Sequence, residues 1–346
     1  MANLKTVDLK IYIYSGASGS YSDSDLVYEL QKEIITGQTK VLFEIAELVR
    51  DYIDITFNDD YISRTIWVTT LATLSDDTNQ VFTYGSPLTS TYLAFDGYGY
   101  FQEEINPQLT DAFDLITNTN IYLPESTAGK LPLYAATVGK VIIDSTTTDI
   151  VNGSGLCRGN DGNYSAANCN DSAEKILYIT IPQNSSTIQI YATDKTTLKK
   201  TITVNNICEP KFTPYKVTFV NRYGAYQDFY FFKKTVETFN VTDEKYKSNT
   251  IQNSSVTYNT YSGQQTRYNI NAVSSLKLNT GFVVEDMVEV IEELFLAENV
   301  WIRYENKTLP IIPTSKDFTV KSSLNDKLIN YTIDFDFAFN KMNNVR

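Results

Sequence analysis

Residues 216–232 read KVTFVNRYGAYQDFYFF, and this stretch decides which kind of fold the chain adopts. Two runs rich in valine, phenylalanine and tyrosine, residues 216–220 and 228–232, flank the tetrapeptide NRYG at positions 221–224. β-Branched and aromatic residues favour strands, and asparagine and glycine tolerate the positive φ angles that tight turns require. The stretch therefore predicts a β-hairpin.

The two ends of the chain carry the alternation of apolar and polar residues that is typical of strands. Residues 9–14 read LKIYIY, and residues 331–339 read YTIDFDFAF. In the second run the odd positions are predicted to face a core, and Asp334 and Asp336 to face solvent. With 25 tyrosines and 18 phenylalanines among 346 residues, the composition agrees with a mainly β chain.

Three segments show helical spacing instead. Residues 285–298 predict a helix that lies on a sheet, with an apolar stripe and an acidic outer face: Met287, Val290, Ile291 and Leu294, against Glu289, Glu292 and Glu293. Residues 39–52 predict a second helix that begins at Thr39 and buries Leu42, Ile45, Leu48, Val49 and Tyr52. Residues 43–54 also fit a strand followed by a turn. A third helix is predicted over residues 25–34.

The composition changes near residue 150 and again near residues 205–214, so we expect three domains. They are an N-terminal β-rich domain (1–150), an inserted small β-sandwich-like module (151–208) and a C-terminal β domain (209–346) that contains the helix at 285–298. The module is predicted to hold strands at 176–181, 187–192 and 200–204. The expected class is mainly β with a few helices (α+β), multidomain, with sandwich- or barrel-like β domains.

A polar, tyrosine-containing run at residues 248–262, SNTIQNSSVTYNTYS, is predicted to be either a long exposed hairpin arm or a flexible loop. An exposed arm would suit contacts between subunits. Abundant tyrosine also fits large subunit interfaces, in which aromatic residues are enriched.

Charge and residue content exclude several function classes. The chain has 29 basic and 41 acidic residues and a formal net charge of −12, which opposes binding to phosphate backbones, so we expect no sequence-specific nucleic-acid partner. It has no histidine, which excludes a Ser-His-Asp triad, imidazole metal ligands and an HExxH zinc site. We predict no catalytic, cofactor-binding or metal-ligating residues and no cofactor.

Cysteine and hydropathy patterns add little chemistry. The three cysteines, Cys157, Cys169 and Cys208, are too few for a four-thiolate zinc site. A disulfide between Cys157 and Cys169 and three free thiols both remain open, and free thiols are the ordinary state in a protein that is assembled in a cytoplasm. No apolar stretch approaches the length of a membrane span, and no secretory signal is visible, so we expect a soluble chain without membrane insertion.

Acidic residues that are close in sequence invite a glycosidase hypothesis, because two carboxylates at a suitable separation hydrolyse glycosides. The candidates are Asp59 and Asp60, Asp76 and Asp77, Glu103 and Glu104, and Asp334 and Asp336. Solvated carboxylates are the ordinary alternative, and we favour it. The sequences NDGN at 160–163 and GYG at 97–99 are interpreted as turns rather than as calcium or nucleotide loops.

Four segments resemble virion structural proteins of tailed phages that infect Bacteroidetes-type hosts. They are residues 216–234, 281–302 (GFVVEDMVEVIEELFLAENVWI), 324–346 (LNDKLINYTIDFDFAFNKMNNVR) and 43–54 (FEIAELVRDYID). The resemblance implies a non-enzymatic component of a tail, baseplate or neck, arranged in a ring with copies of itself and with other virion proteins. It also implies location in the virion after assembly in the host cytoplasm.

A different class of function remains open beside this one. Exposed tyrosine and tryptophan side chains stack on sugars, so a carbohydrate-binding adhesin or receptor-binding tail-tip protein is the alternative hypothesis. The only tryptophans, Trp67 and Trp301, lie in strand-like apolar runs, and we expect both to pack in a core. A carboxylate-based glycosidase is the third hypothesis.

Overall fold

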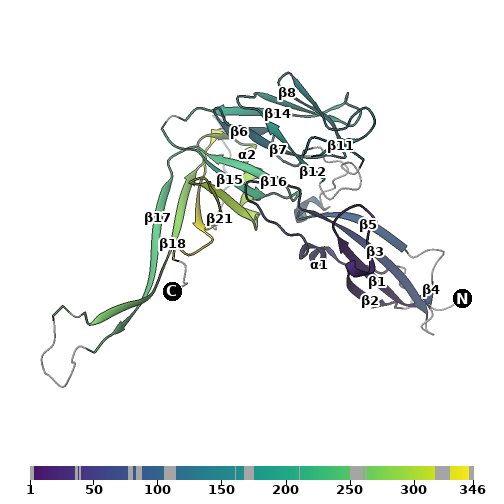
Figure 1. Cartoon of the computed structure of the whole chain (residues 1–346), viewed down its shortest axis with the longest axis horizontal. Helices are drawn as coiled ribbons and strands as arrows, with labels where there is room; N and C mark the ends of the chain where they lie inside the picture. The colour runs from purple at the N-terminus through teal and green to yellow at the C-terminus, as the bar shows by residue number, and fades with distance from the viewer. Residues whose placement is uncertain are drawn as a thin grey trace.

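The computed structural model describes residues 4–35, 38, 40–76, 81–82, 88–104, 114–159, 161–166, 175–209, 211–249, 260–261, 263–315 and 328–342. Of the described residues, 52% lie in strands and 8% in helices, and the strands form several sheets, which confirms the β-rich α+β class (Figure 1). The described elements form an N-terminal sheet, a middle β module and a C-terminal sheet with one helix and a long arm.

The N-terminal sheet has the order β2-β1-β3-β4, and β5 also pairs with β3. Its strands are β1 (Leu4–Tyr14), β2 (Leu26–Glu33), β3 (Thr65–Asp76), β4 (Val81–Phe82) and β5 (Leu88–Phe95). One face packs around Ile11 and Val68, and the other packs around Tyr14 and Trp67. Burial of Trp67 agrees with the sequence prediction, because alternate residues of β1 and β3 enter different clusters.

Two helix predictions in this region are wrong. Most of residues 25–34 form β2. This strand pairs with β1 over seven positions, and the pairing overrides the helical propensity of the segment. Residues 39–52 contain only the single-turn helix α1 (Ala46–Arg50), and Ile45 begins it without a side-chain cap. Within the predicted stripe Val49 is buried, whereas Leu42 is 78% exposed. Thr39 lies outside the described residues.

The middle module joins chain segments from both sides of residue 150. A five-stranded sheet of order β6-β14-β13-β8-β9 and the pair β12-β7 enclose one core. The strands are β6 (Asn120–Pro124), β7 (Gly129–Tyr134), β8 (Val138–Ile143), β9 (Thr146–Asp149), β12 (Ile176–Ile181), β13 (Thr187–Ala192) and β14 (Leu198–Ile207). The last three confirm the predicted strands. Both sheets use strands from before and after residue 150, so the expected boundary there does not separate two sheets.

A short ribbon closes one end of this module. It pairs β10 (Cys157–Arg158) with β11 (Tyr164–Ser165). Cys157 is a disulfide cysteine, whereas Cys208 carries an exposed free thiol. Of the two alternatives left open by the sequence, three free thiols is therefore wrong, and Cys169 lies outside the described residues.

The C-terminal sheet has the order β16-β15-β20-β21-β23-β18-β17. Its strands are β15 (Tyr215–Val220), β16 (Tyr226–Phe231), β17 (Val236–Lys247), β18 (Gln265–Asn279), β20 (Val300–Tyr304), β21 (Lys307–Pro313) and β23 (Thr332–Phe337), with a short separate pair of β19 (Val283–Val284) and β22 (Leu328–Ile329). β15 and β16 confirm the predicted hairpin. Phe219 and Phe335 are fully buried in its core.

Helix α2 (Met287–Leu296) confirms the prediction over residues 285–298, and Val290, Ile291 and Leu294 pack into the core of this sheet. One part of that prediction is wrong, because Glu293 is fully buried rather than on an acidic outer face. Trp301 on β20 is half-buried and contacts Phe57, with ring centroids 5.4 Å apart.

The hairpin β17–β18 continues beyond the sheet as a two-stranded arm (Figure 1). Every residue of β17 except Asp243 is exposed, and so are the first five residues of β18. Of the predicted arm at 248–262, the structure describes residues 248–249 and 260–261, and the strands on both sides of it are paired. The arm points away from α1 and the N-terminal sheet.

Candidate functional site

The three parts of the molecule meet at the turn of the β15–β16 hairpin. Gly224 has φ 71°, and a Cβ atom there would lie 2.9 Å from the backbone nitrogen of Asp96. A Cβ atom on Gly97 would lie 2.6 Å from the carbonyl oxygen of Arg222, to which Tyr98 donates a backbone hydrogen bond of 2.9 Å. Glycine is therefore required on both sides of this contact, because any side chain would separate the two backbones. The GYG segment is a docking surface for the NRYG turn.

A polar network fills the space behind this turn. The Asn221 amide donates to the carbonyl of Leu115 at 2.5 Å and to the side-chain oxygen of Gln227 at 2.9 Å. Gln227 donates in turn to Asn118 at 3.2 Å. Because these side chains are buried, their hydrogen bonds are needed to offset the cost of removing them from water.

Glu293 extends the network toward α2. Its carboxyl group accepts hydrogen bonds from the Thr117 hydroxyl at 2.9 Å and from the Arg222 backbone N–H at 3.4 Å. Burial raises the pKa of Glu293 to about 7 against these two hydrogen bonds. The guanidinium of Arg222 binds Glu103 instead, with one contact of 2.9 Å. The positive charge of Arg222 also lowers the pKa of Glu293, but burial outweighs it.

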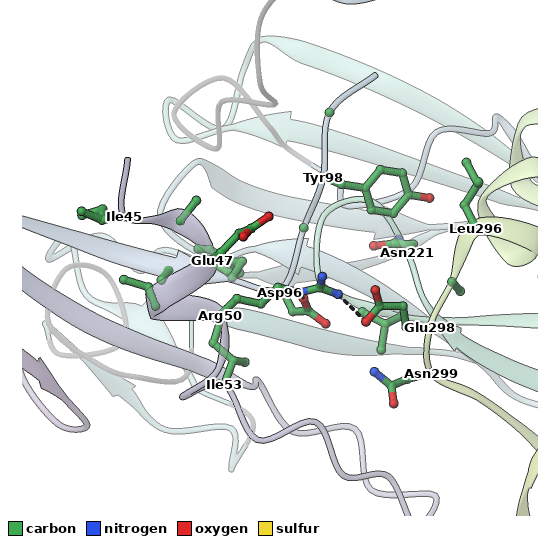
Figure 2. Close-up of a pocket in the computed structure, with 18 of the residues that line it drawn as sticks. Ile45, Glu47, Arg50, Ile53, Asp96, Tyr98, Asn221, Leu296, Glu298 and Asn299 are labelled. Carbon is green, nitrogen blue, oxygen red and sulfur yellow. Dashed lines mark hydrogen bonds and ion pairs between the residues drawn. The ribbon is translucent and has the colours of Figure 1, made fainter. Parts of the chain in front are cut away.

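A cavity of about 820 Å³ lies beside this network, between α1, β5 and the loop that follows α2. We call it the junction cavity (Figure 2). Its apolar wall includes Val49, Val68, Phe95, Val220 and Leu296. The volume is in the range of ligand and side-chain binding pockets.

One arginine spans the mouth of the junction cavity. Arg50 of α1 donates to Asp96 at 2.7 Å and to Glu298 at 2.6 Å, and Figure 2 shows the contact with Glu298. These carboxylates come from the N-terminal sheet and from the loop after α2, so Arg50 joins the two parts. Glu47 also lines the cavity.

Large apolar side chains at the cavity edge are open to solvent. Phe101 is fully exposed, Tyr92 is 56% exposed and Leu296 is 52% exposed. A cluster of exposed large apolar groups beside a hollow is typical of an interaction surface rather than of ordinary protein exterior.

The part of the arm farthest from the sheet, residues 243–247 and 265–268, has two chemically different faces, and we call it the distal arm. The pairs Glu244↔Tyr268 and Tyr246↔Thr266 place both tyrosines on one face, with ring centroids 5.7 Å apart. The pairs Lys245↔Arg267 and Lys247↔Gln265 place all three basic side chains on the other face. In a chain with a net charge of −12, this is a local concentration of positive charge on a protruding element.

A second, polar hollow of about 370 Å³ contains one of the acidic residues considered above. Lys216 binds Asp59 at 2.5 Å and the Tyr61 hydroxyl at 2.9 Å. The Tyr61 hydroxyl donates to Asp228, and burial with that carboxylate nearby raises the pKa of Tyr61. Asp60 does not line this hollow and pairs with Arg64 at 3.3 Å.

The other acidic candidates are not brought together. Asp334 pairs with Lys277 at 3.4 Å, and β23 lies between β21 and β18, so Asp334 and Asp336 do not protect an edge strand. Glu103 binds Arg222, Asp76 ends β3, and Asp77 lies outside the described residues. Asn163 donates to Asp161 in a turn, as interpreted from the sequence, and Asn160 lies outside the described residues.

The sequence prediction missed the contact between Gly97 and the NRYG turn, and it misplaced Glu293. Both glycine segments were visible as turns, but nothing in the sequence indicates that two turns 125 residues apart bind each other. Glu293 lies on the flank of the apolar stripe, three residues after Val290, and this position was the available signal.

Among the described residues no group of three or more cysteine and acidic side chains is arranged to hold a metal ion. No helix in the same part of the chain is long and apolar enough to cross a membrane. Comparison with protein families, with curated proteins and with solved structures returned no match.

Proposed function

We propose that this chain is a non-enzymatic structural subunit of a phage virion, part of a ring in a tail, baseplate or neck, and that it acts through oligomeric assembly. The observation that carries the proposal is the β17–β18 arm. Its strands of 12 and 15 residues extend from the sheet and expose apolar side chains: Val236, Phe239, Val241, Tyr246 and Tyr268.

An arm of this kind is costly for an isolated chain. A two-stranded ribbon alone is marginally stable in water, and a long exposed edge strand offers unpaired backbone groups to other chains. No described strand pairs with the outer edge of β17. A neighbouring subunit would supply both the missing backbone partners and a cover for the apolar side chains, which explains why such an arm is kept.

The remaining observations support assembly rather than catalysis. The carboxylates considered for glycoside hydrolysis are distributed over separate ion pairs and turns. Ring formation requires heterologous contacts, in which one surface of a subunit meets a different surface of the next. The arm and the N-terminal sheet lie at different ends of the molecule, which suits such a contact (Figure 1).

The test compares the full chain with an armless variant in which Asn-Gly replaces residues 243–270. That loop joins Thr242 to Asn271, which are paired across the hairpin, and a two-residue Asn-Gly turn fits such a pair. We expect the full chain to form closed oligomers in analytical ultracentrifugation and the variant to remain monomeric with an unchanged melting temperature. Mass spectrometry of purified virions should detect the chain as a particle component.

The proposal fails if the full chain stays monomeric at high concentration and purified virions lack it. It also fails if the armless variant assembles as well as the full chain does. A variant that loses its cooperative melting transition would be replaced by Phe239→Ser, which changes an exposed residue at the root of the arm and leaves the hairpin intact.

The alternative is a carbohydrate-binding adhesin or receptor-binding tail-tip protein, and the polar hollow at Asp59 favours it. Three tyrosines, two lysines and two aspartates line that hollow: Tyr61, Tyr178, Tyr230, Lys130, Lys216, Asp59 and Asp228. Aromatic rings beside carboxylates match the mixed apolar and hydroxyl surface of a sugar. Binding on a glycan array that is lost in Lys216→Ala would support this function, and an array without any hit would remove it.

A further inference from the structure

We infer that the distal arm of one copy docks into the junction cavity of the next copy. This inference rests on the proposed assembly function and names the partner surface of the arm. It makes the contact heterologous, because the arm and the cavity are different surfaces of the same chain. Repetition of one such contact generates a ring when the rotation closes.

The cavity needs an apolar occupant. Its wall contains Val49, Val68 and Leu296, and the aromatic rings of Tyr92 and Phe101 stand exposed at its edge. Leaving these groups in water costs free energy in proportion to their apolar area. The distal arm presents Tyr246 and Tyr268, which are 51% and 46% exposed and lie on one face. Tyrosine anchors in pockets commonly dominate the binding energy of protein interfaces.

The charges of the two surfaces are complementary. Glu47, Asp96 and Glu298 line the cavity against the single base Arg50, so three negative charges face one positive charge. The distal arm carries Lys245, Lys247 and Arg267 against Asp243 and Glu244, which leaves one net positive charge. Opposite net charges on the two surfaces steer association and fix the orientation of the docked element.

The arm of the same copy does not supply the occupant. It leaves the C-terminal sheet in a direction away from α1, which forms one side of the cavity (Figure 1). A second copy carries the same arm, and because every copy has one arm and one cavity, the two surfaces are present in equal numbers. Insertion of the aromatic face toward the apolar wall would leave the basic face toward Glu47 and the other carboxylates at the mouth.

Cross-linking tests the contact directly. In a Cys208→Ser background, which removes the exposed free thiol, size-tagged Lys247→Cys chains are mixed with Glu47→Cys chains and oxidised mildly, because Lys247 lies on the face that docking turns toward Glu47. We expect a disulfide-linked heterodimer of two differently tagged chains. The matched control is Leu198→Cys in place of Glu47→Cys, because Leu198 is 47% exposed on the middle module, outside the cavity. Equal yields with the two partners would overturn the inference.

Charge exchange provides a second measurement. Lys245→Glu with Lys247→Glu should weaken self-association about tenfold in ultracentrifugation, and Glu47→Lys in the partner chains should recover most of the loss. If removal of the arm abolishes assembly while cross-linking and charge exchange show nothing, the proposed function stands and this docking site is wrong. The same holds if a map of the particle shows a different virion protein in the cavity.

Discussion

The junction and the distal arm use similar residues in opposite ways. At the junction, Tyr98 and Arg222 lie between chain segments, and a fully buried carboxyl group on Glu293 completes the contact. On the arm, Tyr246 and Arg267 are about half exposed. The junction is therefore completed within one chain, whereas under the proposed function the arm is completed by another.

Strand β18 has one part that is packed within the chain and one part that is exposed. From Asn271 to Asn279 buried positions alternate with mostly half-buried ones, with Leu276 and Leu278 in the core, whereas the first five residues are all exposed. Pairing with β23 ends at Ser275, and burial continues three residues further to Ala272, whose carbonyl accepts the backbone N–H of Lys341. A strand without a neighbour has no layer on which to bury a face.

The largest expected effect is a difference in the free energy of unfolding between a substitution in the core and one at the root of the arm. Phe219→Ala removes a fully buried ring from the C-terminal core and should lower the free energy of unfolding by about 3–5 kcal/mol. Phe239→Ala removes a ring that is 55% exposed and should change it by less than about 0.5 kcal/mol. Urea denaturation of the unassembled chain measures both. A similar loss in the two variants would show that the arm is packed in the isolated chain.

The next effect depends on pH. Burial holds the pKa of Glu293 at about 7, above the ordinary value of 4.5, so the folded state binds more protons than the unfolded state between these values. The stability of the natural chain relative to Glu293→Gln should therefore fall by about 3 kcal/mol as the pH rises from 4.5 through 7, and stay level above that.

Unfolding of both chains at several pH values measures this difference. Glu244→Gln on the exposed arm is the control for replacing a glutamate by glutamine outside the core. Parallel curves for the natural chain and Glu293→Gln would contradict the assignment of a proton to this buried group.

A smaller effect tests the glycine contact. Gly224→Ala places a methyl group 2.9 Å from the Asp96 backbone at φ 71° and should cost about 1–3 kcal/mol. Gly19→Ala has nearly the same φ, 75°, but meets no atom within 4 Å, so it reports the backbone cost alone. Thermal unfolding of the two variants gives the difference. Equal losses would mean that the close approach of the two segments adds nothing.

The smallest effect concerns ion pairs. Arg50→Ala breaks the contacts with Asp96 and Glu298, and Arg267→Ala breaks the contact with Asp243. Both arginine side chains are about half exposed, so each change should cost less than about 1 kcal/mol in an isolated chain. Assembly should depend on Arg267 more than stability does, and sedimentation of the Arg267→Ala variant tests this.

The sequence predicted the local elements well where one physical signal dominated. The β15–β16 hairpin, the three strands β12, β13 and β14, and α2 followed from β-branched composition or apolar periodicity. The segment 25–34 became a strand because β1 pairs with it, and that partner lies outside any local window. The pairing of β12 with β7, which lie on opposite sides of the expected boundary at residue 150, also lies outside any local window.

The candidate site was much less accessible to sequence reasoning. Asn221 and Gly224 were recognised as turn residues, but their contact with Gly97 depends on the way two sheets are oriented. Burial of Glu293 depends on Thr117 and Arg222, which reach it from distant parts of the chain. Periodicity predicts which face of an element is apolar, and it does not predict which polar residue at the edge of that face will be covered.

The arm contains a β-bulge, which affects its shape but not the faces on which its side chains lie. Between Thr242↔Asn271 and Glu244↔Tyr268 strand β18 contains one residue more than β17, and Asn269 adopts φ 49°. Such a bulge bends a ribbon yet keeps the flanking pairs on their original faces. Loss of that extra residue would straighten the arm and would leave each tyrosine and lysine on the face where it now lies. In an assembly of the kind proposed, the curvature and the adhesion between its members would consequently be encoded at different positions, so that either could vary while the other is kept.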